Sequence, residues 1–232
     1  MWDDARKLQR LANALFGLSF ALILLGAAHY MVHLPAFAVR SIHLSIEPQR
    51  ADAGQIEAAA RAAMHGNFFT ADLDSVRQAI EQVPWVHTAS VRRVFPWALE
   101  VTLDEQVALA RWNDAELVNT DGEVFPGQTD LILPKFDGAP GSAAEIAQMY
   151  RALSEKLAPL DQVIAQISLS PRHAWQLRLD NGTVLELGRE QTVERLERYV
   201  RVYPGSLAPV QARYVDLRYR NGFAVLLPGG HV

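Results

Sequence analysis

The sequence predicts an α+β protein. It is expected to contain a single transmembrane helix, a β-α-α-β-β domain, and a larger, mostly antiparallel β domain with helices on one side. Three observations predict this class. One apolar stretch near the N-terminus is long enough to cross a bilayer. In the next segment, the spacing of apolar residues changes from that of a strand to that of a helix and back. The remainder contains short runs of alternating apolar and polar residues, separated by Asn-Gly or Asp-Gly turns.

The apolar stretch covers residues 11–34 and contains no Asp, Glu, Lys or Arg. A helix of this length reaches roughly 36 Å at about 1.5 Å per residue, more than a hydrocarbon core of about 30 Å. Because lipid offers no partner to an exposed peptide group, we expect a helix there. The residues expected to anchor it are Leu11, Leu15, Leu18, Leu22, Leu25, Tyr30 and Leu34.

The distribution of basic residues predicts the orientation of this helix. Three basic residues precede the apolar stretch: Arg6, Lys7 and Arg10. The first Lys or Arg after it is Arg40. The positive-inside rule therefore leaves residues 1–10 in the cytoplasm as a short tail and exports everything that follows the helix. A cleaved secretory signal is the alternative, with a cleavage site at Gly26-Ala27-Ala28, but the long apolar run continues past that site and favours an uncleaved anchor.

Composition excludes several classes of protein. The chain has 22 Lys and Arg against 26 Asp and Glu, a formal net charge of −4. A net negative charge argues against a nucleic-acid-binding protein, for which a clustered basic surface is expected. The chain has no cysteine, so the exported domains must be stabilised by their own hydrophobic cores and not by disulfides.

Residues 38–104 are predicted to form the first exported domain. Its expected elements are a strand at 39–47, a helix at 53–65, a helix at 73–83, and strands at 86–94 and 98–104. Asp52 and Gln55 form a capping box at the start of the first helix, and Asp72 can cap the second. The order is β-α-α-β-β, which predicts two helices packed on a three-stranded sheet.

Residues 105–232 are predicted to form the second exported domain. Its expected elements are strands at 107–112 and 117–125, an apolar run at 131–136, a helix that begins after Ser142, a strand at 163–169, a hairpin of 175–180 and 183–187, a helix at 192–202, and a closing hairpin of 213–220 and 223–227. Ser142 and Glu145 have the spacing of a capping box. Tight turns are predicted at Asp121-Gly122, Asn181-Gly182 and Asn221-Gly222.

The closing hairpin contains the candidate functional site. A two-residue turn at Asn221-Gly222 would place Arg218 opposite Val225 and Asp216 opposite Leu227. Phe223, Val225 and Leu227 would then lie on a solvated face beside charged neighbours. The residues expected on the other, core-facing side are Val215, Leu217, Tyr219, Ala224 and Leu226.

The last strand is the final one in the chain and carries no Lys or Glu to protect its edge. Exposed edges of this kind are rare in native proteins unless another strand pairs with them. The pattern therefore favours strand addition by a partner, in which backbone hydrogen bonds give affinity. The alternative is that another segment of the same domain covers the edge.

Motifs along the whole chain, taken together, resemble a known family. In the first exported domain they are Asn67-Phe68-Phe69, Pro84-Trp85-Val86, Val91-Arg92-Arg93-Val94-Phe95-Pro96 and Leu99-Glu100-Val101. In the second they include Trp112, Trp175-Gln176-Leu177, Leu187-Gly188-Arg189 and Tyr214-Val215-Asp216-Leu217-Arg218-Tyr219. Their order and spacing are similar to those of the FtsQ/DivIB family of bacterial cell-division proteins, in which the first exported domain is a POTRA domain.

The resemblance implies an essential, non-catalytic scaffold of the divisome, located at the division septum in the inner membrane. It implies a link between early and late division proteins that coordinates septal cell-wall assembly. FtsB and FtsL would bind directly in the periplasm, and an upstream recruiter such as FtsK would bind the POTRA domain around residues 72–83 and the preceding strand. The FtsB-binding residues that it carries over are Arg172, Tyr219, Asn221, Gly222, Phe223, Ala224, Val225, Leu226 and Leu227.

Two other functional classes stay open on the sequence. One is a POTRA-containing factor of outer-membrane assembly or secretion, against which the single span argues. The other is an anchored periplasmic cell-wall enzyme, but the chain has no GxSxG, P-loop or GxGxxG motif. His29 and His33 are four residues apart without a carboxylate beside them, so no metal site is expected. We therefore expect no catalysis, no cofactor, no nucleic acid and no small-molecule substrate.

Overall fold

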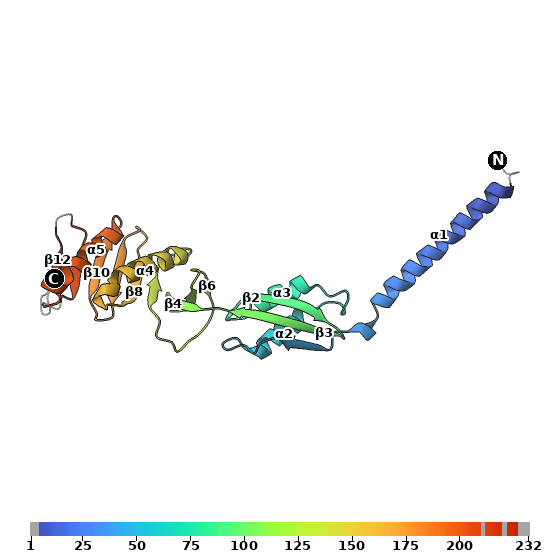
Figure 1. Cartoon of the computed structure of the whole chain (residues 1–232), viewed down its shortest axis with the longest axis horizontal. Helices are drawn as coiled ribbons and strands as arrows, with labels where there is room; N and C mark the ends of the chain where they lie inside the picture. The colour runs from blue at the N-terminus through green and yellow to red at the C-terminus, as the bar shows by residue number, and fades with distance from the viewer. Residues whose placement is uncertain (1–4, 210–211, 220–221, 227–232) are drawn as a thin grey trace. The chain divides into compact units, whose positions relative to one another are not determined.

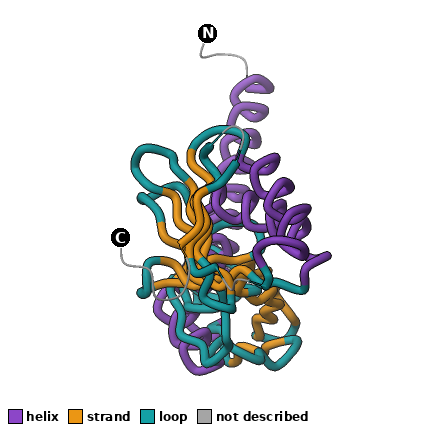
Figure 2. Tube along the Cα trace, turned by 90° about the vertical axis from the view of Figure 1, so that its left-hand side faces the viewer, coloured by secondary structure: helices purple, strands orange, loops and turns teal. Residues whose placement is uncertain are grey.

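The structure, a computed structural model of the chain, describes residues 5–209, 212–219 and 222–226. The chain divides into two compact units, Met1–Glu105 and Gln106–Val232. Each unit contains both helices and strands (Figure 1), and the strands gather into sheets beside the helices (Figure 2). The predicted α+β class is confirmed.

The first unit begins with the long helix α1 (Ala5–Val32). Its segment Gln9–Val32 has the length and composition of a membrane span, with its side chains exposed. The expected anchor residues from Leu11 to Tyr30 lie on this helix. The helix ends at Val32, so Leu34 lies just beyond it and not within it as expected. There the Asn67 side-chain amide donates to the carbonyls of Val32 (2.6 Å) and Leu34 (3.3 Å), which replaces helical hydrogen bonds.

The rest of this unit has the predicted β-α-α-β-β order after a short 3₁₀ turn, η1 (Pro35–Phe37). The elements are β1 (Ser41–Leu44), α2 (Ala53–Ala63), α3 (Leu73–Glu81), β2 (Val86–Val94) and β3 (Ala98–Glu105). The sheet order is β1-β3-β2, with β1 parallel and β2 antiparallel to β3. Asp52 caps α2 as predicted, accepting from the backbone N–H groups of Gly54 and Gln55.

The second unit is built on a mixed nine-stranded sheet of the described residues, in the order β12-β11-β10-β9-β8-β7-β4-β5-β6. Its strands are β4 (Ala108–Trp112), β5 (Glu116–Asn119), β6 (Val124–Phe125), β7 (Lys135–Asp137), β8 (Ile164–Leu169), β9 (Trp175–Leu179), β10 (Val184–Gly188), β11 (Tyr214–Asp216) and β12 (Ala224–Leu226). Five of the eight strand pairs are antiparallel.

Two helices cover one face of this sheet. α4 (Ala143–Leu157) packs against β8, and α5 (Thr192–Val202) packs against β10 and against α4 (Figure 1). Between these helices and the sheet lies a core to which both contribute fully buried side chains. They include Ile146, Leu153, Leu185, Leu196, Tyr199 and Val215. Short helical segments follow each helix: η2 (Ala158–Leu160) and the π-helical η3 (Tyr203–Leu207).

The predicted capping box at Ser142 is wrong, although α4 begins where expected. The Ser142 side chain does not cap α4, because its hydroxyl donates to the carbonyl of Ala139 at 2.7 Å instead. The capping-box spacing is therefore met here without the capping hydrogen bond.

Candidate functional site

The candidate site is the end of the large sheet formed by β11 and β12. β11 is parallel to β10, and β12 is antiparallel to β11. Within the described part of the chain, β12 pairs with β11 alone. Along the other side of β12, the backbone N–H and C=O groups therefore have no strand partner among the described residues. An added strand requires such an unpaired edge.

The register of this closing pair differs from the prediction. Val225 lies opposite Val215 and Ala224 opposite Asp216, so the predicted pairing of Val225 with Arg218 is wrong. The two strands are separated by a longer connection, from Leu217 to Phe223, of which 220–221 lie outside the described residues. Because the register differs by an odd number of residues, the side chains of β12 point to the opposite face of the sheet from the predicted one.

The α5 helix explains why the strand β11 ends early. The guanidinium of Arg198 donates to the backbone carbonyls of Leu217 (2.7 Å) and Tyr219 (2.9 Å). These carbonyls bond a side chain in place of a neighbouring strand. Tyr219 is consequently 59% exposed, and its predicted place on the core-facing side is wrong.

The side chains at the edge of the sheet form a partly apolar surface. Phe223 is half-buried and packs against the core, on the face where it was not expected. Val225 shares the face of the buried Val215, yet it remains 41% exposed because no strand lies beyond it in the described part. Ala224 is exposed, and Gly222 and Leu226 are partly exposed, whereas the predicted site residues Asn221 and Leu227 lie outside the described residues.

Asp216 and Arg218 form a bidentate ion pair beside this edge. The Arg218 Nε donates to Oδ1 at 2.9 Å and Nη2 donates to Oδ2 at 2.6 Å. The hydrogen bonds from Arg218 hold the pKa of Asp216 below its usual value, and the carboxylate raises the pKa of Arg218. Asp216 is 6% exposed, so its expected place on a solvated face is wrong, and its carboxylate is held in the ion pair with Arg218.

Arg172 is exposed in the tight turn between β8 and β9. The turn is closed by the backbone N–H of His173, which donates to the Ser170 carbonyl at 2.8 Å. Trp175, at the start of β9, lies opposite Gly188, at the end of β10. The end of β10 is aligned with the end of β11 at Asp216, and Asp216 lies opposite Ala224, at the start of β12. Arg172 therefore lies at the same end of the sheet as the start of β12, and the strands β9 and β12 are about three strand spacings, or roughly 14 Å, apart.

Several further arginines lie at this end and were missed from the sequence. Arg195 on α5 donates to the Leu187 carbonyl at 2.5 Å, and Arg198 holds the segment after β11. Together the arginines at this end are Arg172, Arg189, Arg195, Arg198 and Arg218. Acidic residues adjacent or close to them in the chain are Glu190, Glu194, Glu197 and Asp216. The only sequence signal for Arg195 and Arg198 themselves was their spacing on one face of the predicted helix at 192–202, which is typical of any solvated helix.

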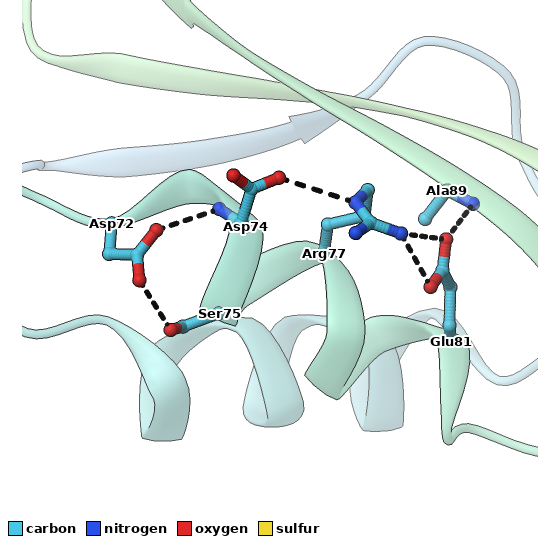
Figure 3. A network of polar contacts seen from close by, with 6 residues as sticks. All are labelled: Asp72, Asp74, Ser75, Arg77, Glu81 and Ala89. Atoms are coloured by element: carbon cyan, nitrogen blue, oxygen red, sulfur yellow. Dashed lines mark hydrogen bonds and ion pairs between the residues drawn. The ribbon is translucent and has the colours of Figure 1, made fainter.

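The other expected surface, residues 72–83 in the first unit, carries an ordered set of charged side chains on α3 (Figure 3). Arg77 Nη1 donates to both carboxylate oxygens of Glu81 at 2.9 and 2.8 Å, and Glu81 raises the pKa of Arg77. Glu81 also accepts from the backbone N–H of Ala89 at 3.3 Å, which ties α3 to β2. At the start of α3, a hydrogen bond from Ser75 lowers the pKa of Asp72. These contacts fix the charged face of α3 relative to the sheet.

Comparisons with known proteins match both units. A model of the FtsQ-type POTRA domain matches residues 37–106, and a model of the C-terminal part of the cell division proteins FtsQ and DivIB matches residues 110–218. The chain is 40% identical to cell division protein FtsQ of Burkholderia pseudomallei, over 99% of this chain and 95% of the relative. It is 39% identical to that of Nitrosospira multiformis, over 97% and 98% of the two chains. It is 36% identical to that of Bordetella pertussis, over 98% and 93%. The first unit thus contains a POTRA domain, and the chain belongs to the FtsQ family of cell division proteins.

Proposed function

We propose that this protein is a non-catalytic scaffold of the divisome that binds FtsB, and with it FtsL, through the edge strand β12. Its helix α1 would anchor it in the inner membrane, with the N-terminus in the cytoplasm and both domains in the periplasm. Anchoring in the membrane plane raises the effective concentration of the protein for partners anchored in the same membrane. In this role it links early and late division proteins at the septum.

The observation that carries the proposal is the edge position of β12. Backbone groups along one side of Ala224–Leu226 have no strand partner among the described residues, and Val225 is 41% exposed beside them. An added strand from FtsB would bond these groups and cover Val225. Strand addition of this kind gains its affinity from main-chain hydrogen bonds and its register from alternate side chains.

The arginines at the same end of the sheet support a second part of this contact. Arg172 is exposed and lies on the same sheet end as Phe223. An acidic side chain on FtsB that follows the added strand would meet Arg172. Exposed charges at the rim of an interface mainly steer association and fix register, so we assign Arg172 that role and assign the main affinity to β12.

For the POTRA domain we propose recruitment by an upstream protein such as FtsK. Its sheet has the order β1-β3-β2, so β1 is an edge strand, and the charged face of α3 is held in place by the Arg77–Glu81 pair. The edge of β1 and the face of α3 are the two surfaces that we assign to this partner. Loss of recruitment without loss of FtsB binding would be the expected effect of changes there.

The test of the main proposal is a binding titration of the full-length protein, held in lipid nanodiscs, with the periplasmic segment of FtsB. The variants are Ala224→Pro and Val225→Pro, because successive residues of a strand direct their N–H groups to opposite sides. One proline removes an N–H that faces the partner, and the other removes one that bonds β11. Ala224→Thr and Val225→Thr are the matched controls, since they keep the N–H group and a side chain suited to strands.

We expect one proline variant to bind at least about tenfold more weakly, a loss of about 1.4 kcal/mol in binding free energy. Its melting temperature should change little. The other proline variant is expected to melt at a lower temperature. Both threonine controls should bind nearly as the unchanged protein does. Equal affinity for all four variants, with circular dichroism showing each one folded, would exclude strand addition at β12.

A further inference from the structure

A cluster of five aromatic side chains lies at the end of the POTRA domain that follows α1. Its members are Phe37, Phe68, Phe69, Phe95 and Trp97. They come from three segments: the turn η1, the connection between α2 and α3, and the turn between β2 and β3. Trp97 is within 6.0 Å, between ring centroids, of each of the other four. The rings therefore form one continuous apolar surface.

This cluster is only partly used as a core. Phe68 is buried, but Phe69 is 49% exposed and Phe95 is 76% exposed. A single exposed aromatic residue is ordinary on a protein surface, whereas several adjoining exposed rings mark a contact surface. The cluster therefore has an apolar face that nothing in the described part of the chain covers.

Hydrogen bonds fix the cluster to the end of α1. The backbone N–H of Phe68 donates to the carbonyl of Phe37 at 2.8 Å. The buried side chain of Asn67 donates to the carbonyl of Val32, the last residue of α1, and accepts from the backbone N–H of Phe69 at 3.0 Å. The Asn67 side chain thus links the backbone of Phe69 to the end of α1.

Arginine contacts hold the same segment from the sheet side. Arg93 on β2 donates to the carbonyls of Phe68 and Ala71, both at 2.6 Å. The N–H of Arg40 donates to the carbonyl of Trp97 at 2.8 Å. These bonds hold the segment that carries Phe68 and Phe69 to β2, and the turn that carries Trp97 to Arg40.

We propose that Phe69, Phe95 and Trp97 insert into the headgroup region of the bilayer that α1 crosses, as a second membrane contact. The occupant of the apolar face is therefore lipid. A span that ends at Val32 places that carbonyl at the membrane surface, and Asn67 links the cluster to it, since its side chain bonds both the Val32 carbonyl and the Phe69 N–H. Aromatic residues are favoured at this depth because their rings displace interfacial water while any polar group stays hydrated.

This contact rests on the proposed anchoring by α1 and adds a consequence to it. A helix alone allows the domain that follows it to turn about the point of exit from the membrane. A second contact at Phe69 and Phe95 limits that rotation. It would thereby restrict the directions in which the POTRA domain can present β1 and α3 to a partner.

The test uses the absence of cysteine from the chain. Single cysteines are placed at Phe95, at Ile46 and at Leu22, and each is labelled with an environment-sensitive fluorophore. Each full-length variant is reconstituted into vesicles of equal amounts of phosphatidylcholine and phosphatidylglycerol. Fluorescence quenching by lipids that carry a nitroxide near the headgroup or deep in the acyl chain reports the depth of the label. Ile46 is the matched control, since it is 72% exposed in the same domain but lies beyond the far end of β1.

We expect the label of Phe95→Cys to be quenched by the shallow nitroxide at least about twice as strongly as that of Ile46→Cys. The label of Leu22→Cys should be quenched by the deep nitroxide, which tests the anchor separately. Quenching at position 22 with none at 95 overturns this inference and leaves the anchor intact, and the aromatic face would then be a surface for a protein. Equal quenching at 95 and 46 also overturns it. Absence of deep quenching at 22 would contradict the proposed anchoring itself.

A second measurement guards against damage by the substitution at Phe95. In the otherwise unchanged protein with a label at Ala38→Cys, an exposed position next to Phe37, Phe95→Ser should reduce shallow quenching, whereas Ile46→Ser should not. Circular dichroism on each variant establishes that the domain is folded. Unchanged quenching after Phe95→Ser would contradict a role for that ring in membrane contact.

Discussion

Val225 lies directly opposite Val215 in the antiparallel pair of β12 and β11. Val215 is fully buried beneath α5, whereas Val225 is 41% exposed on the same face. The buried core of the second domain therefore continues to the edge of the sheet and ends at an incompletely covered side chain. An added strand would complete this core as well as the backbone hydrogen bonds of the edge.

The ion pair of Asp216 and Arg218 should make the stability of this domain depend on pH. Asp216→Asn keeps the shape of the side chain but removes its charge. Because Asp216 is buried and accepts charge-assisted hydrogen bonds, we expect the free energy of unfolding to fall by about 1–3 kcal/mol at pH 7. Chemical denaturation of the two proteins measures this difference.

The sign of the pH effect follows from the lowered pKa of Asp216, which is caused first by the hydrogen bond from Arg218. The stabilisation is complete above the unfolded-state pKa of about 3.9 and is lost as pH falls through the lower folded-state value. The difference between the unchanged protein and Asp216→Asn should therefore shrink below about pH 4. A difference that stays constant from neutral to acidic pH would contradict this role of the ion pair.

Gly122 and Gly182 occupy similar hairpin turns but have different surroundings. Both have positive φ, +85° and +84°, so alanine is strained at either position. A Cβ at Gly122 would lie 2.5 Å from the Ala144 Cα, whereas nothing lies within 4 Å of one at Gly182. We expect Gly182→Ala to lower the unfolding free energy by about 1 kcal/mol and Gly122→Ala to cost roughly 1–3 kcal/mol more. Thermal denaturation compares them, and equal losses would show that α4 moves away freely.

Asn67 should stabilise the junction between α1 and the POTRA domain. Asn67→Ala removes the donor to Val32 and the acceptor for Phe69, and the side chain is buried, so we expect a loss of about 1–3 kcal/mol. Asn67→Asp keeps the acceptor but directs a carboxylate at the carbonyls of Val32 and Leu34. Hydrogen exchange at the amides of Phe69 and Thr70 should therefore rise in the alanine variant more than in the aspartate variant. Equal exchange rates in both variants would argue that the acceptor side of Asn67 contributes little.

Arg172 should affect partner binding without affecting stability. It is exposed in the β8–β9 turn, so Arg172→Glu is expected to change the unfolding free energy by less than about 0.5 kcal/mol. Binding of the FtsB periplasmic segment should weaken several-fold, chiefly through slower association at low salt. Arg178→Glu is the matched control, because Arg178 is also exposed but lies at the other end of β9. Equal effects of the two substitutions would indicate a general charge effect and no specific contact.

Local patterns in the sequence were sufficient for most of the individual elements. The apolar stretch gave the long N-terminal helix, the β-α-α-β-β order was correct, and the predicted helix at 192–202 has the observed bounds. These features depend on periodicity, on capping residues such as Asp52, and on turn residues that lie next to one another in the chain.

Two Asn-Gly pairs show where local patterns stop being sufficient. Asn181-Gly182 closes a short hairpin between β9 and β10, as predicted. The same dipeptide at 221–222 predicted a tight turn, yet Val225 pairs with Val215 and the connection is longer. The difference comes from Arg198, which lies about twenty residues away in sequence and binds the carbonyls of Leu217 and Tyr219. Asn-Gly is a strong local hairpin signal, yet tertiary hydrogen bonds such as those from Arg198 can override it.

The sequence by itself thus determined the long apolar N-terminal helix, the order of the two units and the position of the last described strand. The tertiary structure alone decided the register of β12 against β11, which face its side chains occupy, and that Arg172 shares the end of the sheet where β12 begins. The physical reason is that the spacing of apolar residues in the sequence shows only which face of a single helix or strand is buried. The pairing of segments far apart in the chain is set by long-range contacts, such as the parallel alignment of β10 with β11, which no local pattern records.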